Sequence, residues 1–356
     1  MSTGIVQEDI RAVVGRVGRA FERLAGKTIL LTGGTGFIGS YLLETLAYVN
    51  DEVLPRPCQV QAVTRDPSRV WKRLPHLRGR TDLRLLEADV RTFRRESASW
   101  DFVIHGAAPA DARGFMRDPL GTVQTIVEGT GAVLGAVAEA KVQRLLFLST
   151  GAVYGHQPVE QPWLPETHGG GPDTRDFRSC YAEAKRCAES LCRIVEETRG
   201  VPVSIARLFA LVGPYQDLNA TSAVVDFIRQ GLEGPVITIH DDGQTVRSYC
   251  YIADAVTALW KLLLDAEAGA AVNVGSDLEA VSFVELAHRV GRCLGKPVSV
   301  VVEGEPARGV LGRRYAPDVS RLFQVTGFRP ATTLDEALSR TVAWMTERPR
   351  VGAPNP

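Results

Sequence analysis

The sequence lacks the features that mark several large classes of protein. Its 41 basic and 41 acidic residues cancel to a formal net charge of zero. No basic block points to a nucleic acid or a membrane surface as a partner. No stretch reads as long and apolar enough to cross a bilayer, and no signal-peptide core opens the chain. These absences predict a soluble protein of the cytoplasm.

Cysteine is scarce and follows no recognisable pattern. The six cysteines form no CxxC pair and no Cys/His spacing typical of zinc ligands. We therefore expect no metal site, and thiols that stay reduced as in a cytosolic protein. The residues concerned are Cys58, Cys180, Cys187, Cys192, Cys250 and Cys293.

A glycine-rich stretch, residues 32–39, is the most informative feature that is present. It reads TGGTGFIG, follows the apolar run 28–31, and precedes the helical pattern of residues 41–46. Strand, glycine turn and helix in this order are typical of a dinucleotide-binding site.

Three of the four glycines in this stretch have a predicted task. Gly33 allows the tight turn, Gly36 allows close approach of a pyrophosphate, and Gly39 allows the helix to pack on the strand. Phe37 and Ile38 open the helix, where unpaired N–H groups and the helix dipole favour an anion.

Short apolar runs alternate with helical patterns along the first two thirds of the chain. This rhythm predicts an α/β fold of Rossmann type, a doubly wound parallel sheet covered by helices on both faces, over residues 27–207. A further strand near 271–275 would return to the same sheet. The other expected strands are residues 59–64, 82–86, 101–105, 144–149 and 201–207.

The ends of the chain differ from this rhythm. Residues 1–26 contain apolar residues at helical spacing, which predicts an amphipathic helix packed on the main domain. Residues 208–345 mix shorter elements and predict a smaller α/β lobe, built from discontinuous segments, that binds the substrate. The proline-rich end, residues 346–356, is expected to be disordered.

Tyr181 and Lys185 carry the candidate chemistry. Positions i and i+4 share one face of a helix, so the phenol and the ammonium can converge on one point. A lysine cation nearby favours the phenolate and would make the tyrosine an acid–base group at neutral pH. Thr150 ends the fifth expected strand, at the sheet edge where open α/β sheets bind ligands, and its hydroxyl can donate to a substrate oxygen.

These three stretches, in this order, resemble the extended short-chain dehydrogenase/reductases of the NAD-dependent epimerase/dehydratase family, which modify nucleotide sugars. The resemblance covers residues 26–344. It implies that Tyr181 exchanges a proton with the sugar C4 oxygen while a hydride moves between C4 and the nicotinamide. It also implies that Thr150 binds the substrate and that Lys185 also holds the nicotinamide ribose.

Further contacts follow from the same resemblance. Asp89 and Val90 would lie at the adenine, and Ala107 and Ala108 at the nicotinamide ribose. Substrate contacts are expected from Arg247, which matches a residue at the sugar-nucleotide diphosphate, and from Arg314. His105, at the end of its strand, is interpreted as a packed neutral histidine rather than a base.

The end of the second strand bears on the cofactor. Sites specific for NAD place an acidic residue there, whereas this chain has Arg65. Arg65 could pair with a 2′-phosphate, which favours NADP(H). Asp66 could reach a ribose 2′-hydroxyl instead, so NAD(H) stays possible.

Family 4,6-dehydratases follow the catalytic threonine with Asp-Glu, and decarboxylases carry a Glu in the same turn, whereas this chain has Gly151 and Ala152. The first prediction is therefore an NADP(H)-dependent 4-ketoreductase acting on a UDP-, TDP-, CDP- or GDP-linked 4-keto sugar. The alternative is an NAD-dependent nucleotide-sugar 4-epimerase or a UDP-glucuronate decarboxylase. A third hypothesis is a dinucleotide-binding protein without catalysis. Relatives are often homodimers through helices beside the sheet, so a homodimer is expected.

Overall fold

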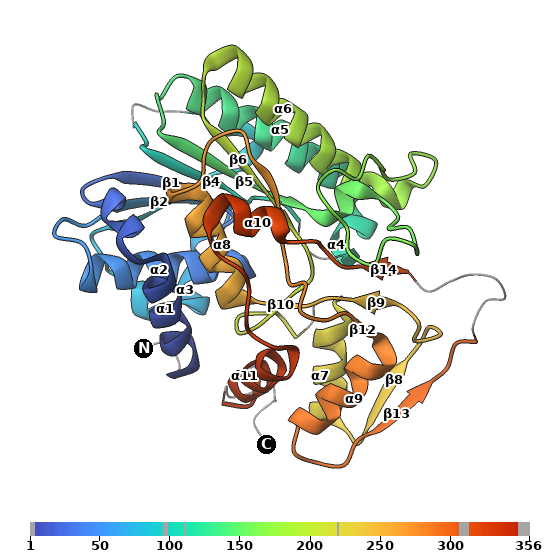
Figure 1. Cartoon of the computed structure of the whole chain (residues 1–356). Coiled ribbons are helices and arrows are strands. Elements are labelled where there is room, and N and C mark those ends of the chain that lie inside the picture. The colour runs from blue at the N-terminus through green and yellow to red at the C-terminus, as the bar shows by residue number, and fades with distance from the viewer. Residues whose placement is uncertain (1–3, 95–98, 110–111, 219–220, 306–312, 348–356) are drawn as a thin grey trace.

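The computed structural model describes residues 4–94, 99–109, 112–218, 221–305 and 313–347. At its centre lies a seven-stranded sheet with the strand order β11-β6-β5-β4-β1-β2-β3, in which every pairing is parallel (Figure 1). The first six strands have the doubly wound order, with the topological switch between β1 and β4. The predicted Rossmann-type fold is confirmed. The strands are β1 (Thr28–Thr32), β2 (Gln59–Thr64), β3 (Leu83–Glu87), β4 (Phe102–His105), β5 (Arg144–Thr150), β6 (Val203–Leu208) and β11 (Ala271–Val274).

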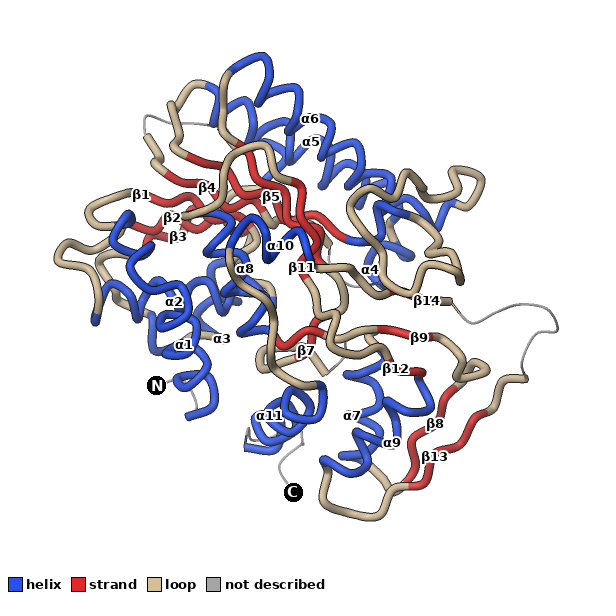
Figure 2. The backbone as a smooth tube through the Cα atoms, viewed as in Figure 1, coloured by secondary structure: helices blue, strands red, loops and turns tan. Residues whose placement is uncertain are grey.

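Helices cover both faces of this sheet, which explains why the central strands are apolar along their whole length rather than alternately. All four residues of β4 are buried, as are six of the seven residues of β5. One face is covered by α5 (Pro119–Ala138) and α6 (Cys180–Arg199), the other by α2 (Phe37–Glu52) and α8 (Ile252–Leu264) (Figure 2).

The expectation that no stretch could cross a membrane is wrong for α5. Within the described residues this 20-residue helix is long and apolar enough by length and composition alone. It packs along α6 and against the 3₁₀ turn Val90–Thr92 on one face of the sheet. Apolar residues of α5 are therefore used in the packing of the domain.

The N-terminal segment packs on the main sheet domain. Helix α1 (Gly4–Val17) and the 3₁₀ turn Gly18–Leu24 bury one apolar face against α2 and α8. Phe21 meets the ring of Trp260 edge-on, with 5.4 Å between centroids. Apolar residues at helical spacing thus form a face that the main domain covers.

The chain after β6 supplies a second group of elements beside the carboxyl edge of the sheet (Figure 2). Helices α7 (Ala223–Glu233) and α9 (Phe283–Cys293) pack on the parallel pair β8 (Val236–Ile239) and β13 (Ser299–Val302). A small sheet joins β12 (Val281–Ser282), β9 (Val246–Arg247) and β14 (Arg314–Tyr315). The pair β7 (Leu211–Val212) and β10 (Cys250–Tyr251) links this region to the main domain.

The last two helices return toward the main domain. Helix α10 (Ser320–Thr326) contacts α8 and β11, and α11 (Leu334–Glu347) contacts α9, β7 and β10. Sequence analysis placed residues 346–356 in a disordered tail, but Thr346 and Glu347 complete α11. The rest of that predicted tail lies outside the described residues.

Candidate functional site

The glycine turn joins β1 to α2 at the switch point of the sheet. Gly33 has a φ of +83°, and a Cβ there would lie 2.6 Å from the carbonyl oxygen of Gly106. A Cβ on Gly39 would lie 2.3 Å from the carbonyl oxygen of Gly33. Only glycine fits at both positions without moving backbone.

The same turn leaves room for a phosphate. A Cβ on Gly36 would meet only the Gly33 oxygen, at 3.4 Å, so the space beside Gly36 is otherwise open. Gly36 is the N-cap of α2 and has no side chain with which to cap its N–H groups. The start of α2, at Phe37 and Ile38, is thus a helix N-terminus suited to an anion. These residues fit the pyrophosphate of a dinucleotide.

The loop after β4 lies against this turn. The Thr32 hydroxyl accepts hydrogen bonds from the backbone N–H groups of Gly106 (3.2 Å) and Ala107 (3.1 Å). Ala107 and Ala108 therefore follow the glycine turn at the carboxyl edge of the sheet, as the resemblance implies for residues at the nicotinamide ribose.

The adenine end of the predicted site is less open to a ligand. Asp89 accepts a hydrogen bond from the Arg91 backbone at 2.9 Å and pairs with the Arg91 guanidinium at 2.7 Å. Val90 is buried and packs against Gly129 of α5. The Asp89 carboxylate is therefore already occupied within its own turn.

Two residues of opposite charge, Arg65 and Asp66, directly follow β2. Arg65 is exposed, and its charge adds to the hydrogen bond from Arg91 that lowers the pKa of Asp89. Asp66 caps the short helix α3 (Pro67–Arg73), where its carboxylate accepts hydrogen bonds from the Ser68 backbone (3.0 Å) and hydroxyl (2.6 Å). Both groups follow the strand whose end contacts the ribose 2′-hydroxyl of NAD or the 2′-phosphate of NADP in sites of this kind.

Thr150, Tyr181 and Lys185 lie on β5 and α6 at the carboxyl edge of the sheet, and the Lys185 ammonium contacts the backbone of β5. Thr150 is the last residue of β5 and is 8% exposed, while Tyr181 and Lys185 lie in the first turns of α6. A hydrogen bond with Thr150 lowers the pKa of the Tyr181 phenol. The ring of Tyr181 stacks on Phe115 of α4 (Ala112–Arg117), with centroids 5.1 Å apart.

The expected effect of Lys185 on Tyr181 is not what the structure shows. Burial raises the pKa of Tyr181 well above its ordinary value, and Lys185 is not among the groups that lower it. The Lys185 ammonium instead donates to the Leu148 carbonyl at 2.7 Å and lies 4.7 Å from the centroid of the Phe147 ring. Burial also lowers the pKa of Lys185 to about 8. Loss of hydration on burial therefore changes the pKa of Tyr181 and of Lys185 more than the attraction between phenolate and ammonium that their spacing suggests.

His105 is a packed neutral histidine, in agreement with the interpretation from the sequence. Burial lowers its pKa to about 3, and its two ring nitrogens contact the hydroxyls of Thr32 (2.7 Å) and Thr130 (3.1 Å).

The two predicted substrate arginines differ in their surroundings. The Arg247 guanidinium lies over the rings of Phe283 (5.7 Å) and Tyr315 (5.5 Å). Tyr315 borders the turn Gly151–Tyr154 that follows Thr150, here called the catalytic turn. Arg314 donates to the Pro162 carbonyl at 2.7 Å and lies over Trp163. Arg247 is thus close to the cluster, whereas Arg314 binds a neighbouring loop.

Sequence reasoning missed two aromatic residues at this site, Phe209 and Tyr315. They stack with centroids 4.5 Å apart and lie directly beside Gly151, where a Cβ would be 2.5 Å from the Phe209 ring. Tyr315 lies in a two-residue strand of the second lobe. Its approach to Gly151 depends on tertiary packing that no local pattern reports.

A partly buried ion pair between β6 and α6 lies next to the catalytic turn. Arg207 of β6 binds Glu189 of α6 at 2.7 Å, and Glu189 accepts a hydrogen bond from the Ser149 hydroxyl at 2.5 Å. Arg207 also donates to the Tyr154 hydroxyl at 2.9 Å, and Tyr154 donates to Asn273 at 2.8 Å. Because each charge is paired, the network can hold Thr150 in place.

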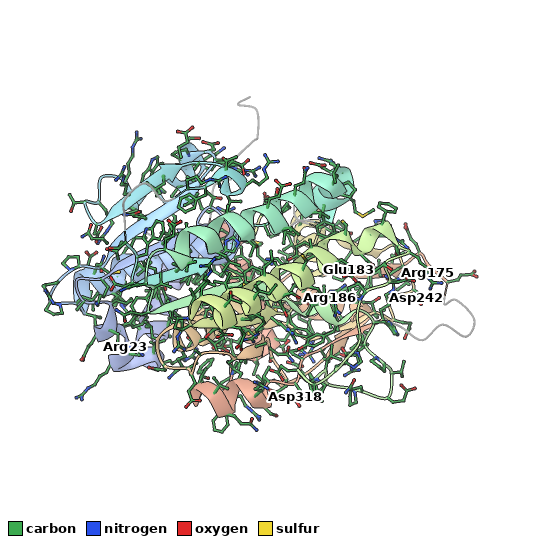
Figure 3. The ribbon with its side chains drawn as sticks, turned by 90° about the horizontal axis from the view of Figure 1, so that it is seen from above. Arg23, Arg175, Glu183, Arg186, Asp242 and Asp318 are labelled. Carbon is green, nitrogen blue, oxygen red and sulfur yellow. The ribbon has the colours of Figure 1, made fainter. Side chains whose placement is uncertain are left out.

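A cleft of about 540 Å³ borders this network without reaching the three candidate catalytic residues. It lies between α6 and the loop after Tyr154, and Figure 3 shows Glu183 and Arg186 on its α6 side. Arg186 donates to the carbonyls of Val153 (2.9 Å) and Gly170 (3.1 Å), so the cation tethers that loop to α6.

Comparison with known proteins gives the family. Residues 29–275 match the model of the NAD dependent epimerase/dehydratase family. The chain belongs to this family. The predicted resemblance is confirmed, and with it the assignment as an enzyme of this group.

Individual relatives are consistent with this family. The chain is 32% identical to UDP-glucuronic acid decarboxylase 6 of Arabidopsis thaliana, over 87% of this chain and 86% of the relative. It resembles a solved UDP-galactose 4-epimerase with a TM-score of 0.71 and 26% identity, over 90% and 99% of the two chains. It also resembles the dTDP-glucose 4,6-dehydratase DesIV from Streptomyces venezuelae, solved with NAD and TYD bound, with a TM-score of 0.75 and 26% identity, over 90% and 97%.

Proposed function

We propose that this protein is an NAD-dependent 4-epimerase of a UDP-linked sugar. The observation that carries the proposal is the Thr150, Tyr181 and Lys185 cluster on a turn that continues with Gly151 and Ala152. This set provides for proton exchange at the oxygen of one sugar carbon, while a bound nicotinamide would supply and accept the hydride. It provides no carboxylate at the turn for a second reaction, and epimerisation needs none.

The residues of the chain have separate tasks in this reaction. Bound NAD would take a hydride from the sugar C4 and return it. The Tyr181 phenolate accepts the C4 hydroxyl proton and later gives it back. Thr150 donates to the same oxygen, and Lys185 holds the nicotinamide ribose.

The state of Tyr181 makes the first step dependent on the ligands. In the protein alone burial keeps this phenol protonated at neutral pH. A base is needed for oxidation, so binding has to lower its pKa. We expect the acid limb of the pH–rate profile to reflect Tyr181 in the loaded enzyme.

A 4-ketoreductase using NADP(H), our first prediction from the sequence, has less support. The relatives named above are a decarboxylase, an epimerase and a dehydratase, and one of them was solved with NAD. Asp66 at the end of β2 can accept a hydrogen bond from a ribose 2′-hydroxyl, which fits NAD. Arg65 remains the residue that would favour NADP.

UDP-glucuronate decarboxylation is the second candidate, because a relative with that name shares 32% of its residues with this chain. Against it stand Gly151 and Ala152, neither of which can move a proton. Loss of CO₂ would have to proceed from the 4-keto sugar without an acidic residue at the turn.

The test begins with the purified protein. It is denatured, the released nucleotide is identified, and the intact protein is then offered UDP-glucose, UDP-N-acetylglucosamine and UDP-glucuronic acid without added cofactor. We expect bound NAD and a 4-epimer. Release of CO₂ would establish the decarboxylase. A protein that is empty, and that reduces a UDP-linked 4-keto sugar only when NADPH is added, would establish the reductase.

Tyr181→Phe is the matched control. It should fold, keep the nucleotide and lose activity by roughly a hundredfold or more, since it lacks only the proton-transferring oxygen. Full activity in this variant would remove Tyr181 from the mechanism.

We also propose a homodimer formed through the outer faces of α5 and α6. These faces expose the large apolar side chains of Leu120 and Ile194. The composition of α5 supports the proposal, because the most apolar part of this helix is only 44% buried within one chain.

A further inference from the structure

Thr32 of β1 and His105 of β4 form a side-chain pair where these strands end beside the glycine turn. The two residues are direct neighbours in the parallel pairing of the strands. The Thr32 hydroxyl oxygen lies 2.7 Å from Nδ1 of His105. Both residues are only 1% exposed, so this contact is shielded from solvent. The pair is a fixed part of the carboxyl edge of the sheet, where the dinucleotide is expected.

The loop after β4 already uses the acceptor capacity of the Thr32 hydroxyl. The N–H groups of Gly106 and Ala107 donate to its oxygen at 3.2 and 3.1 Å. The Gly106 N–H also reaches the Thr32 carbonyl, at 3.1 Å. A hydroxyl has two lone pairs and one proton, so with two N–H donors in place only the proton is left to donate. That proton has to point at Nδ1 of His105.

The direction of this bond sets the tautomer of His105. Because Nδ1 accepts from Thr32, the ring proton of the neutral imidazole is on Nε2. Nε2 lies 3.1 Å from the hydroxyl oxygen of Thr130, a fully buried residue of α5 that can accept this proton. The ring also packs beside Phe147, with 5.6 Å between centroids. Both ring nitrogens thus have a partner that fits one tautomer.

The loop that Thr32 holds forms one wall of the glycine turn. A Cβ on Gly33 would lie 2.6 Å from the Gly106 carbonyl oxygen, so loop and turn are in backbone contact. Ala107 and Ala108 follow, and the family resemblance places them at the nicotinamide ribose. A displacement of this loop would therefore change the shape of the nucleotide site.

We propose that His105 is a positioning residue for the nucleotide: by accepting the Thr32 proton, it turns both lone pairs of that hydroxyl toward the N–H groups of Gly106 and Ala107, and so fixes the loop expected at the nicotinamide ribose. The inference rests on the proposed function only in that a nicotinamide dinucleotide binds at the glycine turn. A ring with its proton on Nδ1 would instead donate to Thr32 and compete with both N–H groups for the same lone pairs.

The tautomer is measured directly, from the ¹⁵N chemical shifts of protein labelled at histidine, with His105 assigned by comparison with His105→Asn. We expect a neutral ring with its proton on Nε2, with and without nucleotide, between about pH 5 and pH 8. In Thr32→Val, which keeps the shape of the side chain but lacks its hydroxyl, the Nδ1 resonance should move because it loses its hydrogen bond. A proton on Nδ1 in the wild type, or an Nδ1 resonance that Thr32→Val leaves in place, overturns the proposal.

Nucleotide affinity tests the consequence for the loop. It is measured by titration with NAD where the protein is isolated empty, and by exchange against labelled NAD where it is isolated full. Thr32→Val should weaken NAD binding by roughly tenfold, because two N–H groups of the loop lose an acceptor. Thr32→Ser keeps the hydroxyl and should bind NAD like the wild type. Wild-type affinity in Thr32→Val would contradict the proposal.

Thr45→Val is the matched control for the loss of a buried hydroxyl. Thr45 lies on α2 and is fully buried, and its hydroxyl donates to the Tyr41 carbonyl of the same helix at 2.7 Å. This variant should lower the melting temperature and leave NAD affinity unchanged. An equal loss of affinity in Thr45→Val and Thr32→Val would show that the effect is one of general stability and would refute the role of the pair.

Two substitutions at position 105 separate hydrogen bonding from packing. His105→Asn keeps an acceptor near the place of Nδ1, whereas His105→Leu has none. Both should lower the melting temperature, since both change a buried side chain. We expect His105→Leu to lose roughly tenfold more NAD affinity than His105→Asn. Equal losses would mean that His105 acts by packing alone.

Failure of this inference is distinguishable from failure of the proposed function, because neither the tautomer nor NAD affinity requires turnover. If the protein binds NAD with the expected dependence on Thr32 but converts no UDP-sugar, only the epimerase assignment is wrong. If it epimerises a UDP-sugar and the ring proton is on Nδ1, only the role of His105 is wrong.

Discussion

Lys185 shows how burial changes a residue that the sequence presents as a simple cation. Its side chain is 3% exposed, and its ammonium donates to the Leu148 carbonyl at 2.7 Å. Because water is excluded, the charged form loses solvation, and the pKa falls to about 8. Lys185 therefore loses its charge within a pH range that experiments can reach.

Replacing Lys185 by methionine should weaken nucleotide binding by roughly ten- to a hundredfold at pH 7, through loss of a charge-assisted hydrogen bond. The wild-type lysine is charged below its pKa and neutral above it. The ratio of wild-type to variant affinity should therefore shrink as the pH rises through about 8. Binding titrations across this range measure it.

Arg199→Met serves as the control, because it removes an exposed cation from the end of the same helix. It should bind nucleotide like the wild type at every pH. A wild-type to Lys185→Met ratio that stays constant with pH would show that the charge of Lys185 is not involved.

At the scale of elements, two glycines where β1 connects to α2, Gly36 and Gly39, perform different tasks. A Cβ on Gly39 would be 2.6 Å from the Gly34 Cα, so Gly39→Ala forces backbone apart and should destabilise the fold by about 1–3 kcal/mol. Gly36→Ala meets only one atom at 3.4 Å. It should keep near-native stability and lose nucleotide affinity, because its methyl group takes the space of the phosphate.

Thermal unfolding and nucleotide titration together separate these two effects. Gly15→Ala in α1 is the reference, since a Cβ there has no neighbour within 4 Å. It should raise stability by up to about 1 kcal/mol through the higher helix propensity of alanine. Undiminished nucleotide binding by Gly36→Ala would contradict the placement of the pyrophosphate at this turn.

The sequence could predict the elements that have local patterns. The apolar run before the glycine turn, the alternation of strands and helices, and the i, i+4 spacing of Tyr181 and Lys185 are properties of contiguous stretches. The two-residue strand that carries Tyr315 is too short for any period, so its place beside Gly151 could not be predicted. The raised pKa of Tyr181 was missed for a related reason, since burial is set by residues distant in sequence such as Phe115.

At the scale of the whole molecule, one buried carboxylate joins the two ends of the chain. Asp9 of α1 accepts hydrogen bonds from Tyr41 of α2 (2.7 Å) and from Tyr251 at the start of α8 (2.7 Å), and it pairs with Arg340 of α11 (2.8 Å). Asp9 is 3% exposed. The N-terminal helix is thus bound to the last helix by a satisfied polar cluster.

Asp9→Asn should lower the free energy of unfolding by about 3–5 kcal/mol, because it leaves Arg340 without its buried partner. Glu8→Gln is the control, since Glu8 pairs with the same arginine at 3.2 Å but is 63% exposed. That variant should change stability by less than about 0.5 kcal/mol. Denaturant unfolding of the two variants measures the difference, and equal effects would show that the buried cluster adds nothing beyond a surface pair.

The outer faces of α5 and α6 are the surfaces through which we expect two chains to assemble. Helix α6 exposes 55% of Ile194, and α5 exposes 69% of Leu120, on helices that pack against each other. Apolar area of this kind is stabilised by contact with a second copy, which in a two-fold dimer presents the same surface. Ile194→Glu places a charge there that cannot be solvated in a closed interface.

We expect the wild type to have the mass of a dimer in light scattering and Ile194→Glu to have that of a monomer at the same concentration. Leu278→Glu is the matched control, because Leu278 is 47% exposed in a loop away from α5 and α6. It should remain dimeric. A monomeric wild type would refute the dimer, whereas dissociation by Leu278→Glu but not by Ile194→Glu would place the interface on another face.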